Sequence, residues 1–319
     1  MTSHFDWPRR PFSPSGRPRA TRAWRIVIPL LCLWAMGGCG NDAAPAPTEE
    51  SHASVVLITG STDGLGRELA LRAAATGAHV IIHGRNEARA NEVAEAIRSE
   101  GAGSASIHLA DFASLDAVRE MATAIRADYE RLDLLVNNAG VGPGEPGHER
   151  VVTGDGHELR MQVNYLAGYL LTRELLPLLE AGAPSRIVSV ASRNQQPLDF
   201  DDLSMSAGYT GGQAYGRSKL AQILMTLDLV DELAPRGIEL VAVHPAPAME
   251  TALVLETGAT PQSTVEAGAD AVWQAMYGSD FPSGTYFHEL QPSEPHAQAL
   301  DPEARARLRA WSDSVTREP

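Results

Sequence analysis

One tyrosine and one lysine, Tyr215 and Lys219, stand four residues apart at the start of a segment that predicts a helix. Residues with this spacing share one helical face, about a turn apart. A phenol with a pKa of about 10 is a poor acid–base group at neutral pH, but a neighbouring ammonium stabilises the phenolate and lowers that pKa. Lys219 is also the only lysine in the chain. The pair predicts general acid–base catalysis; a surface tyrosine beside a solvated lysine is the alternative.

A glycine-rich turn follows the first expected strand, in the spacing G-x-x-x-G-x-G. The residues that we expect to bind a ligand there are Thr59, Gly60, Thr62, Gly64, Leu65 and Gly66. Glycines let the backbone approach a pyrophosphate, and the N-terminus of the following helix supplies free N–H groups and the positive end of the helix dipole. The turn predicts a dinucleotide site, with an ordinary tight turn as the alternative.

The residue after the second expected strand bears on the choice of nucleotide. A carboxylate there suits an unphosphorylated ribose, whereas an arginine suits a 2′-phosphate. The strand ends at His83 and is followed by Gly84 and Arg85, with no acidic residue at its tip. A guanidinium matches phosphate in charge and geometry, so Arg85 favours NADP(H) over NAD(H). The alternative is that Arg85 is a solvated surface charge.

Polar residues also end the third and fourth expected strands. Asp111 follows the third, where a carboxylate can accept a hydrogen bond from the adenine amino group. Asn138, Ala139 and Gly140 follow the fourth, on the expected nicotinamide side. Simple turn chemistry is the alternative for both groups, because Asp and Asn are common at strand ends.

Short β-branched segments alternate with segments of helical period from residue 54 onward. The expected strands are Val55–Thr59, His79–His83, Ser106–Leu109, Leu134–Asn137, Arg186–Val190, Glu239–Val243 and Gly284–Phe287. The expected helices are Arg67–Ala75, Glu87–Arg98, Leu115–Tyr129, Glu158–Leu179 and Gln213–Leu233. This alternation predicts an α/β fold, with one Rossmann-type doubly wound parallel sheet and helices on both faces. We expect a single NAD(P)-binding domain at 54–319.

Taken together, the glycine turn, the Asn-Asn-Ala-Gly segment, Ser192 and the Tyr215–Lys219 pair resemble the short-chain dehydrogenase/reductase family. The resemblance extends from about 55 to 287. It implies that Tyr215 is the acid–base group and that Lys219 binds the nicotinamide ribose and lowers the pKa of the tyrosine. It implies that Ser192 polarises a substrate carbonyl and that Asn164 holds a proton-relay water. The expected activity is hydride transfer between a nicotinamide and a carbonyl or alcohol.

Eight residues between Ser192 and Tyr215, 197–204, make the chain similar to the retinol-dehydrogenase-like branch of that family. The branch implies NADP(H) and a small apolar carbonyl or alcohol substrate. The chain departs from the family after the sixth strand, where Pro245 precedes alanine in place of glycine. The family glycine that approaches the nicotinamide amide through its backbone is therefore absent, and Thr251 is expected to reach a phosphate or the carboxamide. Similar proteins often pair through the helices at 158–179 and 213–233, so we expect a homo-oligomer.

Two other functions compete with this interpretation. A non-catalytic NADP(H)-binding sensor or scaffold would use the same fold, but its signature would be loss of the serine, tyrosine or lysine. A sugar-nucleotide epimerase would need a longer C-terminal substrate domain than the residues after Val243 supply. The nine histidines from residue 52 onward show no paired metal spacing, so we expect no metal site and interpret them as surface or packing residues. The net charge of −14 argues against nucleic acid as a partner.

The first 40 residues differ from the rest, with six arginines and a single acidic residue. An apolar segment at 26–36 precedes small residues and Cys39, which resembles a lipoprotein export signal. We therefore expect a leader at 1–39 with a lipid anchor on Cys39, then a Pro/Ala-rich linker at 40–53 that tethers the domain to a membrane. The alternative is that translation starts near Met36 and the protein is cytoplasmic.

Overall fold

An eight-stranded sheet forms the centre of the computed structural model, which describes residues 53–145, 147 and 149–317. The strand order is β3-β2-β1-β4-β5-β6-β7-β8. The first seven strands are parallel, and only β8 runs antiparallel to its neighbour. The strands are β1 Val55–Ile58, β2 His79–Gly84, β3 Ser104–Leu109, β4 Leu134–Asn137, β5 Ser185–Val190, β6 Ile238–His244, β7 Thr285–His288 and β8 Gln291–Pro292. The expected α/β fold with a doubly wound parallel sheet is confirmed.

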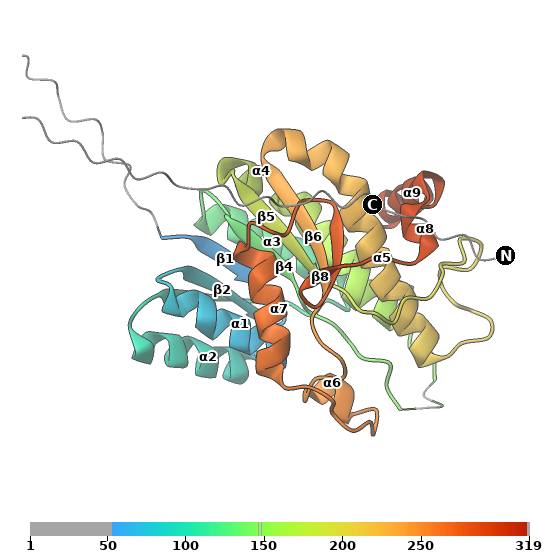
Figure 1. Ribbon diagram of the computed structural model, residues 1–319, viewed down its shortest axis with the longest axis horizontal. Coiled ribbons are helices and arrows are strands. Elements are labelled where there is room, and N and C mark those ends of the chain that lie inside the picture. The colour runs from blue at the N-terminus through green and yellow to red at the C-terminus, as the bar shows by residue number, and fades with distance from the viewer. Residues whose placement is uncertain (1–52, 146, 148, 318–319) are drawn as a thin grey trace, which may run out of the picture. The chain divides into compact units, whose positions relative to one another are not determined.

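Helices cover both faces of this sheet (Figure 1). Alternate residues of a strand point to opposite faces, so Leu57 packs in one core with α3, α4 and α5, whereas Val56 and Ile58 pack in the other with α1, α2 and α7. The α-helices are α1 Gly64–Ala75, α2 Glu87–Glu100, α3 Leu115–Asp128, α4 Ala167–Ala181, α5 Gly211–Leu233, α6 Ala252–Leu255, α7 Val265–Tyr277, α8 Ala297–Leu300 and α9 Pro302–Thr316. A π-helix, Met161–Leu166, leads directly into α4, and a 3-10 turn, Ala234–Arg236, follows α5.

Side-chain caps fix where the helices that follow β1, β2, β3 and β5 begin. An Asp, Asn, Ser or Thr before each helix accepts a hydrogen bond from a first-turn N–H, which would otherwise have no partner. The four caps are Asp63, Asn86, Ser114 and Thr210. The first turns of α1 and α5, which carry the glycine turn and Tyr215, are therefore held at defined places near the carboxyl ends of the strands.

The structure differs from the sequence expectations in several elements. The expected helix at 158–179 begins as the π-helix, and α7 and α9 add helices that the sequence analysis did not predict. The leader at 1–39 and the linker up to residue 52 lie outside the described residues. Among the residues that the structure describes, no helix is long and apolar enough to span a bilayer.

Candidate active site

A cleft of about 660 Å³ lies at the carboxyl ends of the strands. β1 and β4 are neighbours in the sheet, while the chain proceeds outward from them in opposite directions. Ligands of doubly wound folds bind at such a switch point. The cleft is lined by Gly60, Thr62, Gly64, Leu65, Gly66, Arg85, Asp111, Asn138, Ala139, Gly140, Ser192, Tyr215, Lys219, Pro245 and Thr251. The structure thus brings together nearly all the predicted site residues.

The glycine turn is shaped for a group that approaches the backbone closely. Gly60 adopts a φ of +66°, which side chains rarely allow, and a Cβ on Gly66 would lie 2.2 Å from the carbonyl oxygen of Gly60. Thr59 is buried behind the turn, where its hydroxyl accepts hydrogen bonds from the N–H groups of Asn138 and Ala139, both 2.9 Å. In the first turn of α1 the N–H groups of Leu65 and Gly66 have no intrahelical acceptor. This arrangement fits a dinucleotide pyrophosphate.

Two arginines flank the glycine turn where the 2′-position of an adenosine ribose is expected. Arg85 is exposed at the cleft. Arg89, which the sequence analysis missed, also lines the cleft, and its guanidinium contacts Asp63 at 3.0 Å. Asp111 is exposed, and its carboxylate accepts a hydrogen bond from the N–H of Ala113 at 2.9 Å. Only one carboxylate oxygen is used there, so the side chain retains capacity to accept from a ligand.

Ser192 and Tyr215 meet at the other end of the cleft. Ser192 follows β5 and is 8% exposed; its hydroxyl accepts a hydrogen bond from the N–H of Asn194 at 3.1 Å. Burial raises the pKa of Tyr215 above its usual value, and a side-chain hydrogen bond with Ser192 opposes that rise. Since Tyr215 lies in the first turns of α5 and Ser192 at the end of a central strand, the two hydroxyls are held by rigid elements.

Lys219 lies one turn further along α5 and is buried. Its ammonium donates to the carbonyl oxygen of Val190 at 2.7 Å and to Oε1 of Gln222 at 3.0 Å, and lies 5.8 Å from the centre of the Tyr215 ring. Burial lowers the pKa of Lys219 to about 7. Burial is the largest cause of both pKa shifts, and the expected lowering of the Tyr215 pKa by Lys219 stays a prediction.

Asn164 does not line the cleft but braces its wall from the π-helix. Its side chain accepts from the N–H of Val141 at 2.6 Å and donates to the carbonyl oxygen of Val141 at 3.1 Å. It also donates to Ser218, whose hydroxyl donates to the carbonyl oxygen of Tyr215. A π-turn redirects side chains locally and is frequent at functional sites. Here it holds one amide between the loop after β4 and the start of α5.

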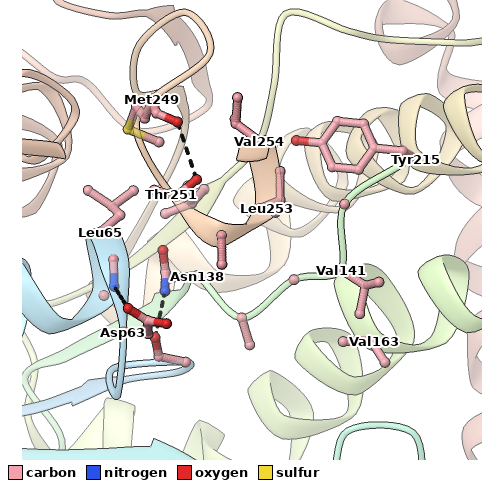
Figure 2. A pocket seen from close by; sticks show the side chains of 18 of the residues that line it. Asp63, Leu65, Asn138, Val141, Val163, Tyr215, Met249, Thr251, Leu253 and Val254 are labelled. Atoms are coloured by element: carbon pink, nitrogen blue, oxygen red, sulfur yellow. Dashed lines mark hydrogen bonds between the residues drawn. The ribbon is translucent and has the colours of Figure 1, made fainter. Parts of the chain in front are cut away.

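Apolar side chains lie near Tyr215 in the cleft (Figure 2). They come from the loop after β4, the π-helix and α6: Val141, Val163, Leu253 and Val254. Thr251 lies against the glycine turn, because a Cβ on Gly64 would meet its methyl group at 3.2 Å. Pro245 and the buried Ala246 line the cleft beside it. This wall suits an apolar substrate body next to a polar reacting group.

Two histidines that the sequence analysis interpreted as surface or packing residues line the cleft. His83 is 3% exposed at the end of β2, and His244 is 5% exposed at the end of β6. Burial lowers the pKa of each to about 4. Their place at the ends of expected parallel strands is the signal in the sequence that indicates the ligand-binding edge of the sheet. Among the described residues, no group of three or more His, Cys, Asp and Glu is placed to hold a metal ion.

Comparisons with known proteins agree with this geometry. A family model described as short chain dehydrogenase matches residues 54–262. Human retinol dehydrogenase 13 is 33% identical over 320 residues, which cover 91% of this chain and 94% of that protein. Mouse polyprenol dehydrogenase is 32% identical over 322 residues, with 91% and 94% covered. Human retinol dehydrogenase 14 is 38% identical over 210 residues, with 61% of each chain covered.

Solved structures show the same fold. A short chain dehydrogenase from Shigella flexneri, complexed with NADP, matches with a TM-score of 0.59 and 28% identity over 75% of this chain and 97% of that one. A 7α-hydroxysteroid dehydrogenase complexed with NADH and 7-oxo glycochenodeoxycholic acid matches with a TM-score of 0.62 over 76% and 95%, and at 20% identity it supports the fold alone. The chain therefore belongs to the short-chain dehydrogenase family, in its retinol-dehydrogenase-like branch, and is an NAD(P)-dependent oxidoreductase.

Proposed function

We propose that the protein interconverts a small apolar carbonyl compound and its alcohol with NADP(H), using Tyr215 as the acid–base group. The observation that carries the proposal is that Ser192, Tyr215 and Lys219 line the same end of one cleft, with Lys219 one helical turn from Tyr215. The bound cofactor supplies or accepts the hydride. During reduction Ser192 donates a hydrogen bond to the carbonyl oxygen, and Tyr215 gives that oxygen its proton. Lys219 holds the nicotinamide ribose.

The proposed substrate is apolar because the wall around Tyr215 is formed by Val141, Val163, Leu253 and Val254. The names of two relatives, retinol dehydrogenase and polyprenol dehydrogenase, refer to apolar alcohols and support this choice. A non-catalytic sensor is less well supported, since the serine, tyrosine and lysine are all present and come together in one cleft.

Replacing the proton donor tests the activity. Purified protein is assayed with NADPH and NADH against a panel of apolar aldehydes and ketones. In Tyr215→Phe the ring still packs but cannot give a proton, so we expect kcat to fall by about a hundredfold or more. Thermal unfolding and NADPH binding serve as controls, and both are expected to stay near wild type. A variant that keeps more than about a tenth of wild-type kcat contradicts the role of Tyr215.

The proposed NADP(H) preference rests on Arg85, which lines the cleft and is exposed to accept a phosphate. A charge-assisted contact contributes about 1.5–3 kcal/mol, so Arg85→Ala should raise KM for NADPH by roughly 10–150-fold and leave KM for NADH nearly unchanged. The matched control is Arg98→Ala. Arg98 lies in the last turn of α2, and its side chain is 72% exposed. Equal effects on both cofactors would mean that Arg85 supports the turn without reading the phosphate.

The leader and linker add a proposed location. We infer from the sequence of 1–39 that the protein is exported and anchored through Cys39, with a cytoplasmic protein starting near Met36 as the alternative. Cell fractionation of wild type and Cys39→Ala distinguishes the two. Wild type in the membrane fraction, with Cys39→Ala accumulating as an uncleaved precursor, supports the anchor. Wild type in the soluble fraction with its N-terminus at Met36 refutes it.

A further inference from the structure

The side chain of His83 joins two segments of the cleft that are far apart in the sequence. Its Nδ1 accepts a hydrogen bond from the N–H of Gly60 at 3.0 Å, and its Nε2 lies 3.2 Å from the carbonyl oxygen of Ala110. The first contact reaches the glycine turn after β1. The second reaches the residue before Asp111, at the end of β3. The imidazole therefore connects the expected pyrophosphate site with the expected adenine site.

The two backbone partners fix which nitrogen carries the proton. An N–H can only donate and a carbonyl can only accept, so Nδ1 must be bare and Nε2 must be protonated. Burial lowers the pKa of His83 to about 4, so the ring is neutral at physiological pH. The ring also stacks on Phe112, with centroids 4.2 Å apart. A neutral, stacked imidazole with both nitrogens engaged has one orientation.

The main chain of His83 strengthens the same connection. Its carbonyl oxygen accepts from the N–H of Ser61 at 2.9 Å, and its N–H donates to the Ser61 hydroxyl at 3.0 Å. Both backbone polar groups of Gly60 are engaged. Its N–H donates to the His83 side chain, and its carbonyl oxygen accepts from the Asn138 amide at 3.3 Å. The N–H of Gly60 is therefore already engaged, whereas the N–H groups of Leu65 and Gly66 in the first turn of α1 have no intrahelical acceptor and can face a phosphate.

We propose that His83 is a positioning residue that fixes the glycine turn and the segment before Asp111 in the arrangement that binds the adenosine diphosphate half of the cofactor. This inference rests on the proposed dinucleotide site. A turn that is already ordered binds more tightly than one that must be ordered on binding. His83 is expected to act on cofactor affinity alone, because Ser192 and Tyr215 hold the reacting groups at the other end of the cleft.

Two variants separate the hydrogen bond from the bulk of the ring. Asn can place its Oδ1 where Nδ1 stood and accept from Gly60, whereas Leu has similar bulk and no acceptor; both lose the stack on Phe112. The matched control is His79→Leu, since His79 is on the same strand with both nitrogens in contact with Ser104, Ser106 and Tyr129, away from the cleft. Calorimetric titration with ADP gives a readout that needs no turnover.

We expect His83→Leu to raise Kd for ADP and KM for the dinucleotide together by about tenfold or more, because the half-buried N–H of Gly60 loses its acceptor and the turn loses its link to β2. Its kcat at saturating cofactor should stay within about twofold of wild type, and His83→Asn should recover most of the affinity. His79→Leu should reduce thermal stability without changing Kd for ADP. If His83→Leu does not fold, His83→Phe, which keeps a stacked ring without an acceptor, takes its place.

Wild-type affinity in His83→Leu, equal losses in the Leu and Asn variants, or a fall in kcat with unchanged Kd for ADP would each overturn the inference. Failure of the proposed function gives a different result. If the function is wrong, the wild-type protein binds ADP and dinucleotide but reduces no carbonyl compound. The calorimetric comparison of the His83 variants then still decides the inference.

Discussion

Burying the ammonium of Lys219 in the cleft lowers the stability of the folded protein. Lys219 is 3% exposed, and its ammonium contacts only neutral oxygens in the structure, those of Val190 and Gln222. Its pKa is about 7 in the folded protein, compared with about 10.4 in an unfolded chain. Below pH 7 both states carry the charge and the full cost of burying it opposes folding. Between pH 7 and about 10 the folded state binds fewer protons, so this contribution to stability becomes more favourable as pH rises.

This linkage predicts the behaviour of Lys219→Met. The variant removes the charge and should lose activity. We expect the Tm of the variant minus the Tm of wild type to be larger at pH 7 than at pH 9.5. The full pKa difference corresponds to several kcal/mol, on the order of 1.4 kcal/mol per unit. Thermal denaturation of both proteins at the two pH values measures it. A constant difference in Tm between the proteins at the two pH values would show that the ammonium is not destabilising.

At the scale of elements, a buried polar cluster fixes the segments that surround Tyr215. Glu158 and Arg160, just before the π-helix, are 0% and 5% exposed. Arg160 donates to the carbonyl oxygen of Gly142 at 2.7 Å, in the loop after β4, and to the Tyr209 hydroxyl at 2.7 Å, just before α5. Tyr209 donates to Glu158 at 3.0 Å. The cluster therefore joins the mouth of the cleft to the helix that carries Tyr215.

Removal of one hydroxyl from this cluster tests its role. Tyr209→Phe leaves Arg160 and Glu158 each short of a partner, at a cost of about 1–3 kcal/mol in stability. Since both α5 and the loop at Gly142 lose support, we expect KM for the carbonyl substrate to rise several-fold while KM for NADPH stays near wild type. Tyr129→Phe, whose hydroxyl lies away from the cleft beside His79, is the matched control. If both variants alter substrate KM equally, the cluster is only a source of stability.

On the scale of the whole molecule, α9 packs on the helices through which we expected the chain to pair. It packs against α5 (Figure 1), and Leu308 is buried in the same core as that helix. Polar contacts add to this, with Tyr165 and Ser312 hydroxyls 2.7 Å apart and Arg309 3.4 Å from Asp228. Pairing through α4 and α5 would have to displace α9. The expected homo-oligomer stays a prediction, and we expect it to use another face.

Detaching α9 should change the association of the chain. Leu308→Asp places a charge in the core between α9 and α5, so apolar side chains that α9 covers become exposed. Sedimentation at several protein concentrations should then show more self-association than wild type. Ser314→Asp adds the same charge to an exposed position of α9 and should leave the sedimentation unchanged. Unchanged association of Leu308→Asp, with α9 shown to be released by proteolysis, would contradict this role of α9.

The sequence by itself determined the class of fold and most members of the cleft. Apolar strand segments alternate with helical ones, and this local pattern is enough to indicate βαβ units and a parallel sheet. The carboxyl ends of parallel strands meet at one edge, so residues such as Gly66, Asp111 and Ser192 could be placed near one another before any contact was known.

Only the tertiary structure decided the roles of residues whose partners are distant in the chain. His83 acts through Gly60 and Ala110, and Tyr209 through Glu158 and Arg160, and no local pattern encodes such pairings. The pKa of Lys219 likewise depends on burial between α5 and β5, which spacing along one helix cannot show. The helix α9 was missed because it is mostly polar and is held by contacts with α5. Burial and long-range hydrogen bonds are properties of the packed chain, so they required the fold.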